Sequence, residues 1–405
     1  MRIVYIHQYF RTPEEAGGTR SYFIASALAH AGHDVIMIGS KPEGQPEAVK
    51  TYSINGFRVI SIRNYYANKL GFYARIKSFF RFMIKASREL FRQKEVDLVI
   101  ATSTPLTVGI PAWLFKKFRK VPYLFEVRDL WPEAPIQMGE LKNPVLRKSA
   151  LVLEKTLYKS AVHIVALSPG MKDGVVKVPG NDEKVSVIPN MAKIDRFWQR
   201  EKNAALMKEL GLEDKAFKII HFGAMGRANG LDYILDAASI LKSRGISDIH
   251  FVMLGEGGVA PHLKKRKTTE ALDNIVFLKK EPMARTSEIV NLCQASIVPF
   301  LNLPVLQTNS PNKLFDSLSA GIPVIVNSAG WTKEMVETHQ CGAFVHPDKP
   351  AELADLVMHW KENQELIKVM GDNARTLAES SYDKSILCKE FVSLVESLFP
   401  EDYAG

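Results

Sequence analysis

The chain has 405 residues, of which 46% are hydrophobic and 24% charged, and its net charge is +9. This composition is typical of a globular protein of two or three domains and excludes a disordered one. The excess of basic residues favours phosphorylated substrates, anionic lipid or nucleic acid as partners.

No run of about 18 apolar residues predicts a membrane span, and Gln8 interrupts the N-terminal apolar run that a signal peptide would need. Three scattered cysteines, Cys293, Cys341 and Cys388, indicate a reducing compartment.

Short apolar runs alternate with amphipathic stretches along the chain. In the first half we expect strands over Ile3–Ile6, Val35–Ile38, Phe57–Ile62, Leu98–Ala101, Tyr123–Val127, His163–Ala166 and Val185–Ile188, with helices over Ser21–Ala31 and Val108–Phe118 among them. The rhythm restarts with strands over Lys218–Phe222, His250–Leu254, Ile275–Leu278, Ile297–Pro299, Val324–Val326 and Ala343–Val345. Such alternation predicts two α/β domains, each with a doubly wound parallel sheet.

The expected domain break follows Pro189, where the chain becomes polar and charged. We therefore predict an N-terminal domain over 1–193, a C-terminal domain over 194–383 and a final helix over 384–405 that packs near their junction. Ligands of such folds bind at the carboxyl ends of strands, so a cleft between the domains is the expected site.

The segment Ser310–Pro323 places Lys313 and Asp316 one helical turn apart, before Ala-Gly-Ile-Pro and an apolar run. A helix is expected to begin near Pro311 and end at Gly321. A lysine at a helix start suits a diphosphate, and a carboxylate on the same face could accept hydrogen bonds from ribose hydroxyls. An ordinary ion pair on a solvated helix explains these two residues equally well.

Three glycine-rich loops follow expected strands. They are Gly17-Gly18-Thr19-Arg20, the segment 222–230 with Gly223, Gly226, Arg227 and Asn229, and Gly255-Glu256-Gly257-Gly258. Such loops let the backbone approach a phosphate, although a plain turn is an equal alternative for the first. A Walker loop is absent. A fourth strand ends in the charged run 126–133, where Arg128 and Asp129 are expected to face the cleft.

The stretch Arg75–Lys94 is strongly basic. On a helical wheel Lys77, Arg81, Lys85, Arg88 and Arg92 lie on one side, and Ile76, Phe79, Phe80, Phe82, Met83, Ile84, Leu90 and Phe91 cover the other. This pattern suits the surface of an anionic bilayer, and a core-packed helix with a solvated basic face is the alternative. A nucleic-acid partner is not expected, because the run is aromatic on one face.

Metal and nucleophile motifs are not found in the sequence. The ten histidines show no metal-ligand spacing, and no Gly-x-Ser-x-Gly elbow occurs. His7 is expected to be structural. We therefore predict no metal and no cofactor.

Taken together, these motifs resemble the retaining glycosyltransferases of family 4. The resemblance covers essentially the whole chain and rests on Ile6–Phe10, Gly17–Arg20, Gly32–Val35, Arg128–Glu133, Val187–Asn190, the loop 223–230 and Ser310–Val324. It implies the GT-B fold, two Rossmann-like domains facing a deep cleft, and it is nearest to the bacterial surface-polysaccharide branch that includes N-acetylfucosamine-type transferases.

The resemblance implies transfer of a sugar from a nucleotide sugar, with UDP as the expected nucleotide, to a lipid-linked saccharide in O-antigen or capsule synthesis. The enzyme would work at the inner face of the cytoplasmic membrane, without metal and with retention of configuration. The implied catalytic residues are Lys313, Arg227, Asp129 and Arg128. The implied donor-binding residues are Gly17, Gly18, Gly223, Gly226, Asn229, Gly255, Glu256, Leu278, Thr308, Asn309, Ser310, Asn312, Lys313 and Asp316.

The sequence also departs from the family pattern. Thr308 and Asp316 stand where two glutamates are usual, and Ala224 and Asn229 stand where an arginine and a lysine are frequent. Two alternatives follow: a UDP-sugar 2-epimerase, which shares the fold, and a non-catalytic pseudo-transferase that scaffolds an assembly complex.

Overall fold

A computed structural model describes residues 1–15, 17–41, 47–65, 71–178 and 182–399 of the chain. These residues form two compact units. The first comprises residues 1–13, 17–189 and the segment from Ser385 onward, and the second comprises 14–16 and 190–384. The chain therefore passes from one unit to the other after Pro189 and returns after Lys384.

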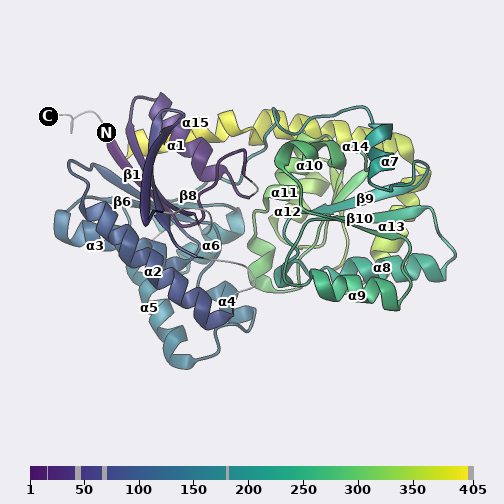
Figure 1. The fold of residues 1–405 in the computed structure, drawn as a ribbon, viewed down its shortest axis with the longest axis horizontal. Helices are drawn as coiled ribbons and strands as arrows, with labels where there is room; N and C mark the ends of the chain where they lie inside the picture. Colours follow the sequence, from purple (N-terminus) through teal and green to yellow (C-terminus); the bar gives the residue numbers. More distant parts are fainter. Residues whose placement is uncertain (16, 42–46, 66–70, 179–181, 400–405) are drawn as a thin grey trace. The chain divides into compact units, whose positions relative to one another are not determined.

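The first unit is built on an eight-stranded sheet in the order β3-β4-β2-β1-β5-β6-β7-β8 (Figure 1). Its strands are β1 (Arg2–His7), β2 (Asp34–Lys41), β3 (Val49–Ile54), β4 (Phe57–Arg63), β5 (Leu98–Thr102), β6 (Tyr123–Val127), β7 (His163–Ala166) and β8 (Val185–Val187). Its helices are α1 (Arg20–His30), α2 (Phe72–Phe91), α3 (Gly109–Arg119), α4 (Glu133–Gln137), α5 (Pro144–Ser160), α6 (Pro169–Val176) and α15 (Lys384–Ser397). The central strands are almost wholly buried, as their unbroken apolar runs predict.

The strand β3 was not predicted from the sequence. It pairs antiparallel with β4 at the edge of an otherwise parallel sheet. Most of its side chains are exposed or half-buried, so it lacks the apolar run that marks the other strands. The turn Asn55-Gly56, with φ of 45° and 86°, joins the two strands. Asn-Gly between extended segments is a strong hairpin signal and could have revealed this strand.

The second unit holds a six-stranded parallel sheet in the order β11-β10-β9-β12-β13-β14. Its strands are β9 (Phe217–Phe222), β10 (Ile249–Leu254), β11 (Ile275–Leu278), β12 (Ala295–Val298), β13 (Val324–Val326) and β14 (Gly342–Phe344). Its helices are α7 (Ala204–Glu209), α8 (Asp232–Ser243), α9 (Ala260–Thr269), α10 (Met283–Val290), α11 (Asn312–Ser319), α12 (Trp331–Thr338), α13 (Pro350–Glu362) and α14 (Gln364–Leu377). Both sheets have the doubly wound α/β architecture that the sequence predicts.

The helix α11 begins and ends where its sequence indicates. Pro311 occupies the N-cap position and Asn312 starts the helix. Ala320 caps the other end, and Gly321 follows with φ of 66°, a left-handed conformation that glycine adopts at little cost. A Cβ at Gly321 would also lie 2.4 Å from the side chain of Gln199. The apolar strand β13 then enters the core, as predicted.

The helix α2 is amphipathic, but its faces differ from the expected ones. Phe79, Phe82 and Leu90 are buried, whereas Phe80 and Ile84 are exposed among the basic residues. The outward face is therefore mixed basic and apolar, and the wheel was wrong to separate Phe80 and Ile84 from the basic side. Lys85 also leaves the basic face, because its ammonium donates to the carbonyl of Arg63 at 2.8 Å. No described helix, α2 included, is long and apolar enough to cross a membrane.

Candidate functional site

Two glycine-rich loops of the second unit interlock at the ends of β9 and β10. Gly223 donates its amide to Leu254, and Met225 donates to the carbonyl of Glu256 at 2.9 Å. A Cβ at Gly255 would lie 2.0 Å from the carbonyl oxygen of Gly223, so only glycine fits there. The loop 255–258 therefore supports the backbone of the loop 223–226, which contains two of the predicted donor-binding glycines.

Lys313 points from α11 to this loop. Its ammonium lies 3.2 Å from Oδ1 of Asn229 and 3.4 Å from Nε2 of His221. No carboxylate pairs with it among the described residues, and burial lowers the pKa of Lys313 to about 7. A group that loses its charge through desolvation regains it beside an anion. The predicted Lys313 and Asn229 thus meet at one point, which has the chemistry of an anion site.

His221 was not predicted as part of this site. It lies on β9, two residues before Gly223, and is wholly buried. Burial, together with the neighbouring Lys313, holds the pKa of His221 well below its ordinary value. The ring is therefore neutral, and Nε2 can accept a hydrogen bond from the lysine ammonium. A single histidine in an apolar strand gives no motif, so only its position ahead of the glycine loop could have identified it.

Asp316 does not join Lys313. It is buried and forms an ion pair with Lys193. Burial raises the pKa of Asp316, and Lys193 opposes this effect. Lys313 and Asp316 are thus not the ion pair that the sequence allowed as an alternative. The carboxylate instead has a separate cation as its partner.

The polar groups of residues 308–310 form hydrogen bonds with other parts of the chain. The Thr308 hydroxyl donates to the carbonyl of Val305 at 2.8 Å, and the indole of Trp331 donates to the carbonyl of Asn309 at 2.8 Å. Ser310 is buried, and its hydroxyl accepts the amide of Asn190 at 3.1 Å. These bonds fix the loop that leads into α11.

The remaining predicted residues of the second unit lie around the same loops. Arg227 is exposed at the start of the short helix 227–229, and Glu256 is exposed in the supporting loop. Leu278 ends β11, where its carbonyl accepts the amide of Gly255 at 3.2 Å. Gly226 precedes Arg227, and Asn312 begins α11.

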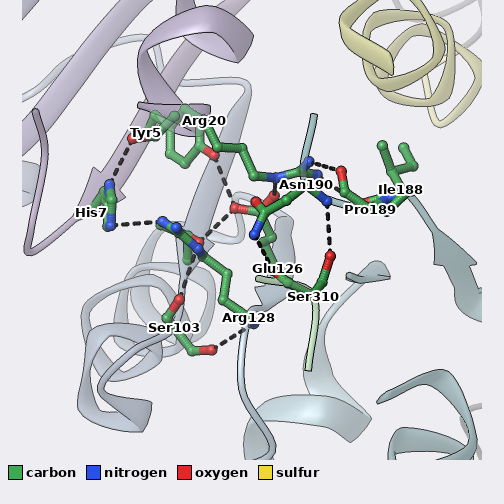
Figure 2. Close-up of polar contacts among 12 residues, drawn as sticks. Tyr5, His7, Arg20, Ser103, Glu126, Arg128, Ile188, Pro189, Asn190 and Ser310 are labelled. Atoms are coloured by element: carbon green, nitrogen blue, oxygen red, sulfur yellow. Dashed lines mark hydrogen bonds and ion pairs between the residues drawn. The ribbon is translucent and has the colours of Figure 1, made fainter. Parts of the chain in front are cut away.

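The first unit has a buried polar network at the carboxyl ends of β1 and β6. Figure 2 shows Arg20 against Glu126, with Nε 2.6 Å from the carboxylate. Tyr5 and Thr102 donate to the other oxygen of Glu126 at 3.1 Å and 2.6 Å. Burial alone would raise the pKa of Glu126, but Arg20, Arg128 and these bonds hold it below its ordinary value. The carboxylate is therefore ionised.

Arg20 also fixes the last residues of the first unit. Its guanidinium donates to the carbonyls of Ile188, at 2.9 Å, and Pro189. Arg20 and Glu126 lie within the motifs Gly17–Arg20 and 126–133, but no role was predicted for either. Their spacing of more than 100 residues gives no local signal of an ion pair.

Arg128 and Asp129 end β6 beside His7. Arg128 donates to Nε2 of His7 at 3.0 Å, so Nδ1 carries the ring proton and donates to the Ser21 hydroxyl at 2.6 Å. His7 is buried, and desolvation followed by Arg128 holds its pKa well below the ordinary value. Asp129 accepts the Thr104 hydroxyl at 2.7 Å, and burial raises its pKa.

The loop before α1 completes this part of the first unit. Gly17 is exposed, with φ of 142°, and Gly18 is half-buried ahead of the N-cap residue Thr19. Among the residues that the structure describes, no group of three or more His, Cys, Asp or Glu could hold a metal ion.

Comparisons with known proteins cover nearly the whole chain. Residues 16–191 match the model of the glycosyl transferase 4-like domain, and residues 202–377 match that of glycosyl transferases group 1. The putative colanic acid biosynthesis glycosyl transferase WcaI of Escherichia coli is 22% identical over 333 residues, 80% of this chain and 78% of that protein. The alpha-D-kanosaminyltransferase of Streptomyces kanamyceticus is 23% identical over 187 residues, so this match spans only 46% of that relative and 45% of this chain.

Solved structures share the fold. Sucrose-phosphate synthase from Thermosynechococcus elongatus superposes with a TM-score of 0.77 at 16% identity, covering 98% of this chain and 99% of that one. Anabaena Alr3699/HepE, in complex with UDP and glucose, gives a TM-score of 0.73 at 17% identity, covering 98% and 100%. With the two doubly wound units, these likenesses confirm the GT-B fold.

Proposed function

Because this chain belongs to the glycosyltransferases with a 4-like domain and a group 1 domain, we propose that it transfers a sugar from UDP to a lipid-linked saccharide with retention of configuration. The acceptor would be an intermediate of bacterial O-antigen or capsule synthesis at the inner face of the cytoplasmic membrane. The observation that carries the proposal is Lys313, a half-buried cation without a carboxylate partner among the described residues, beside a glycine-rich loop.

The donor diphosphate is assigned to this loop. Lys313 donates to the β-phosphate, Asn229 and the backbone of Gly223–Gly226 position it, and exposed Arg227 adds a second cation. UDP as the nucleotide is supported by HepE, whose structures contain UDP and UDP-glucose. The sugar itself is proposed from the sequence resemblance, with amino-deoxy sugars such as N-acetylfucosamine as the first candidates.

The reaction needs charge stabilisation more than a protein base. The bond between the anomeric carbon and the β-phosphate oxygen breaks, and a bond from the acceptor oxygen to the same carbon forms on the same face. The departing phosphate takes the proton of the acceptor hydroxyl. Negative charge develops on this phosphate in the transition state, where a preorganised cation in a desolvated position is most effective. Lys313 would supply that cation without a metal.

The acceptor side is assigned to the carboxyl end of β6. Arg128, oriented by His7, and Asp129, oriented by Thr104, offer a cation and a carboxyl for saccharide hydroxyls. Trp131, three residues after Arg128, packs edge-on against Phe79 of α2 with ring centroids 6.3 Å apart. The same loop thus touches the helix whose basic outward face is proposed to meet an anionic membrane.

A thermal-shift panel of nucleotide sugars tests the donor assignment. A ligand at about 100 times its dissociation constant stabilises the folded chain by roughly 2.7 kcal/mol, which is readily detected. We expect UDP and UDP-linked sugars to raise the melting temperature, and slow release of UDP from the matching donor. Lys368→Ala, an exposed lysine on α14, should respond like the wild type, whereas Lys313→Ala should lose the shift. Stabilisation by other nucleotides but not by UDP would contradict the assignment.

A further inference from the structure

The N-terminal half of α5 carries apolar side chains that are exposed among the described residues. Residues 142–149 are all exposed. Val145 is 70% exposed, Val152 58%, Leu151 46% and Leu146 43%. Val145 and Val152 lie seven residues apart and so share one side of the helix. This end of α5 extends away from the strands of its sheet (Figure 1), so the apolar side chains are on a projecting helix and not in a groove.

Basic side chains surround these apolar ones. Arg147 and Lys148 are exposed on this half of the helix, Lys142 is exposed just before it, and Lys155 is exposed one turn further along. The acid on α5 itself, Glu154, is half-buried, and burial followed by the nearby Glu133 raises its pKa to about 7. The projecting end is therefore strongly positive, and its charge is complementary to an anionic surface.

The helix α2 also exposes apolar side chains among basic ones. Its exposed Tyr73, Phe80 and Ile84, which are 83%, 48% and 63% exposed, lie among the exposed Lys77, Arg81 and Arg88. An ion pair of 3.0 Å between Arg75 and Glu140 joins the first turns of α2 to the segment that leads into α5. The helix α3 packs against both α2 and α5. The two helices are thus connected by direct contacts within the first unit.

We propose that the N-terminal half of α5 inserts Val145 and Val152 into the headgroup region of an anionic bilayer, while its lysines and Arg147 bind the lipid phosphates. The inference rests on the membrane part of the proposed function and adds a second, inserting element to α2. A bilayer fits better than a protein partner, because isolated aliphatic side chains between cations on a convex helix match a lipid interface. A protein partner would need a broad, continuous apolar patch.

Vesicle binding of apolar and matched control variants tests the insertion. Val145→Ser with Val152→Ser removes apolar surface without changing charge. The control, Leu366→Ser with Val369→Ser, changes two aliphatic side chains on α14 of the second unit that are 40% and 46% exposed. With phosphatidylglycerol vesicles we expect the α5 variant to need about tenfold more lipid for half-binding. The control should stay within about twofold of the wild type.

A reporter at the same position measures insertion directly. The three native cysteines are buried, so Val145→Cys can be labelled selectively with a polarity-sensitive dye. We expect a blue shift on adding anionic vesicles, none with neutral vesicles, and none for a dye at Leu366→Cys. No blue shift at position 145, or unchanged binding of the α5 variant, would overturn the inference. So would a wild-type dimer in solution that the α5 substitutions dissociate.

A failure of α5 insertion can be distinguished from a failure of the proposed catalytic function. These assays contain no nucleotide sugar, so a chain that inserts α5 but transfers no sugar would refute only the catalytic proposal. A chain that transfers sugar and binds vesicles through α2 alone would refute only the insertion of α5.

Discussion

Lys313 has an ammonium group whose charge depends on its ligand. Burial lowers its pKa to about 7, and its two polar neighbours, Asn229 and neutral His221, supply no compensating negative charge. An arriving diphosphate would supply that charge and raise the pKa again. The empty and occupied forms of the site therefore differ in the number of protons that they bind.

We accordingly expect UDP binding to take up a proton near pH 8. There the nucleotide is fully ionised and free Lys313 is mostly neutral, whereas at pH 6 the lysine is already charged. Because the bound form has the higher pKa, the contribution of Lys313 to affinity should fall as the pH rises through about 7. Calorimetry in buffers of different ionisation enthalpy measures the uptake. Uptake that persists in Lys313→Ala would assign the proton to another group.

Asp316 has two roles to separate, pairing with Lys193 and the proposed binding of ribose. Breaking a buried pair from either side costs about 3–5 kcal/mol of folding stability. Asp316→Asn and Lys193→Gln should therefore both lower the melting temperature. Only Asp316→Asn should also weaken UDP binding, by about 1.5–3 kcal/mol. Equal UDP affinity in the two variants, measured by calorimetry below their melting temperatures, would remove Asp316 from the ribose site.

At the residue scale, the sequence suggested candidate residues but not the contacts that they make. Lys313 and Asn229 were predicted separately, and the structure brings them together. Asp316 was predicted to share a helix face with Lys313, and its pairing with Lys193, 123 residues away, was not predicted. The fold determines which residues far apart in the sequence form ion pairs and hydrogen bonds. A single sequence has no local pattern from which such pairs could be predicted.

At the scale of elements, two neighbouring glycines of the loop 255–258 look alike in sequence but differ in how closely other atoms approach them. A Cβ at Gly257 would lie 2.2 Å from the carbonyl oxygen of Met225, whereas one at Gly258 would meet nothing within 4 Å. Gly257→Ala should therefore displace the loop 223–226 and destabilise the fold by about 1–3 kcal/mol. Gly258→Ala is the matched control and should be neutral in thermal unfolding. Equal stability of both variants would show that the loops separate without cost.

Elements with long, regular patterns were predicted well, and short or two-sided ones were not. The buried strands and α11 have apolar runs and stop signals that fix their bounds. The edge strand β3 has neither, because water covers much of its surface. The helix α2 was placed correctly, but a helical wheel cannot tell that Phe80 and Ile84 are exposed. The exposure of these side chains depends on which parts of the chain pack against the helix.

At the scale of the whole molecule, the net charge of +9 is concentrated in part on α2. Replacing the exposed Lys77, Arg81 and Arg88 with glutamine should weaken binding to anionic vesicles by about two orders of magnitude, since each contributes roughly 1 kcal/mol. Lys85 is left unchanged because it bonds to β4. Co-sedimentation measures the effect, and high salt should weaken wild-type binding similarly. A wild-type protein that ignores anionic vesicles at low salt would show that this face is merely solvated.

The central claim is that Lys313 stabilises the phosphate as it leaves. The most direct test is the steady-state rate of sugar transfer by Lys313→Ala with the donor identified by thermal shift. Because the charge is needed most in the transition state, we expect kcat to fall about 100-fold or more, with a smaller change in KM. A variant with near-normal kcat and only a raised KM would contradict the account, since Lys313 would then bind the donor without helping it react.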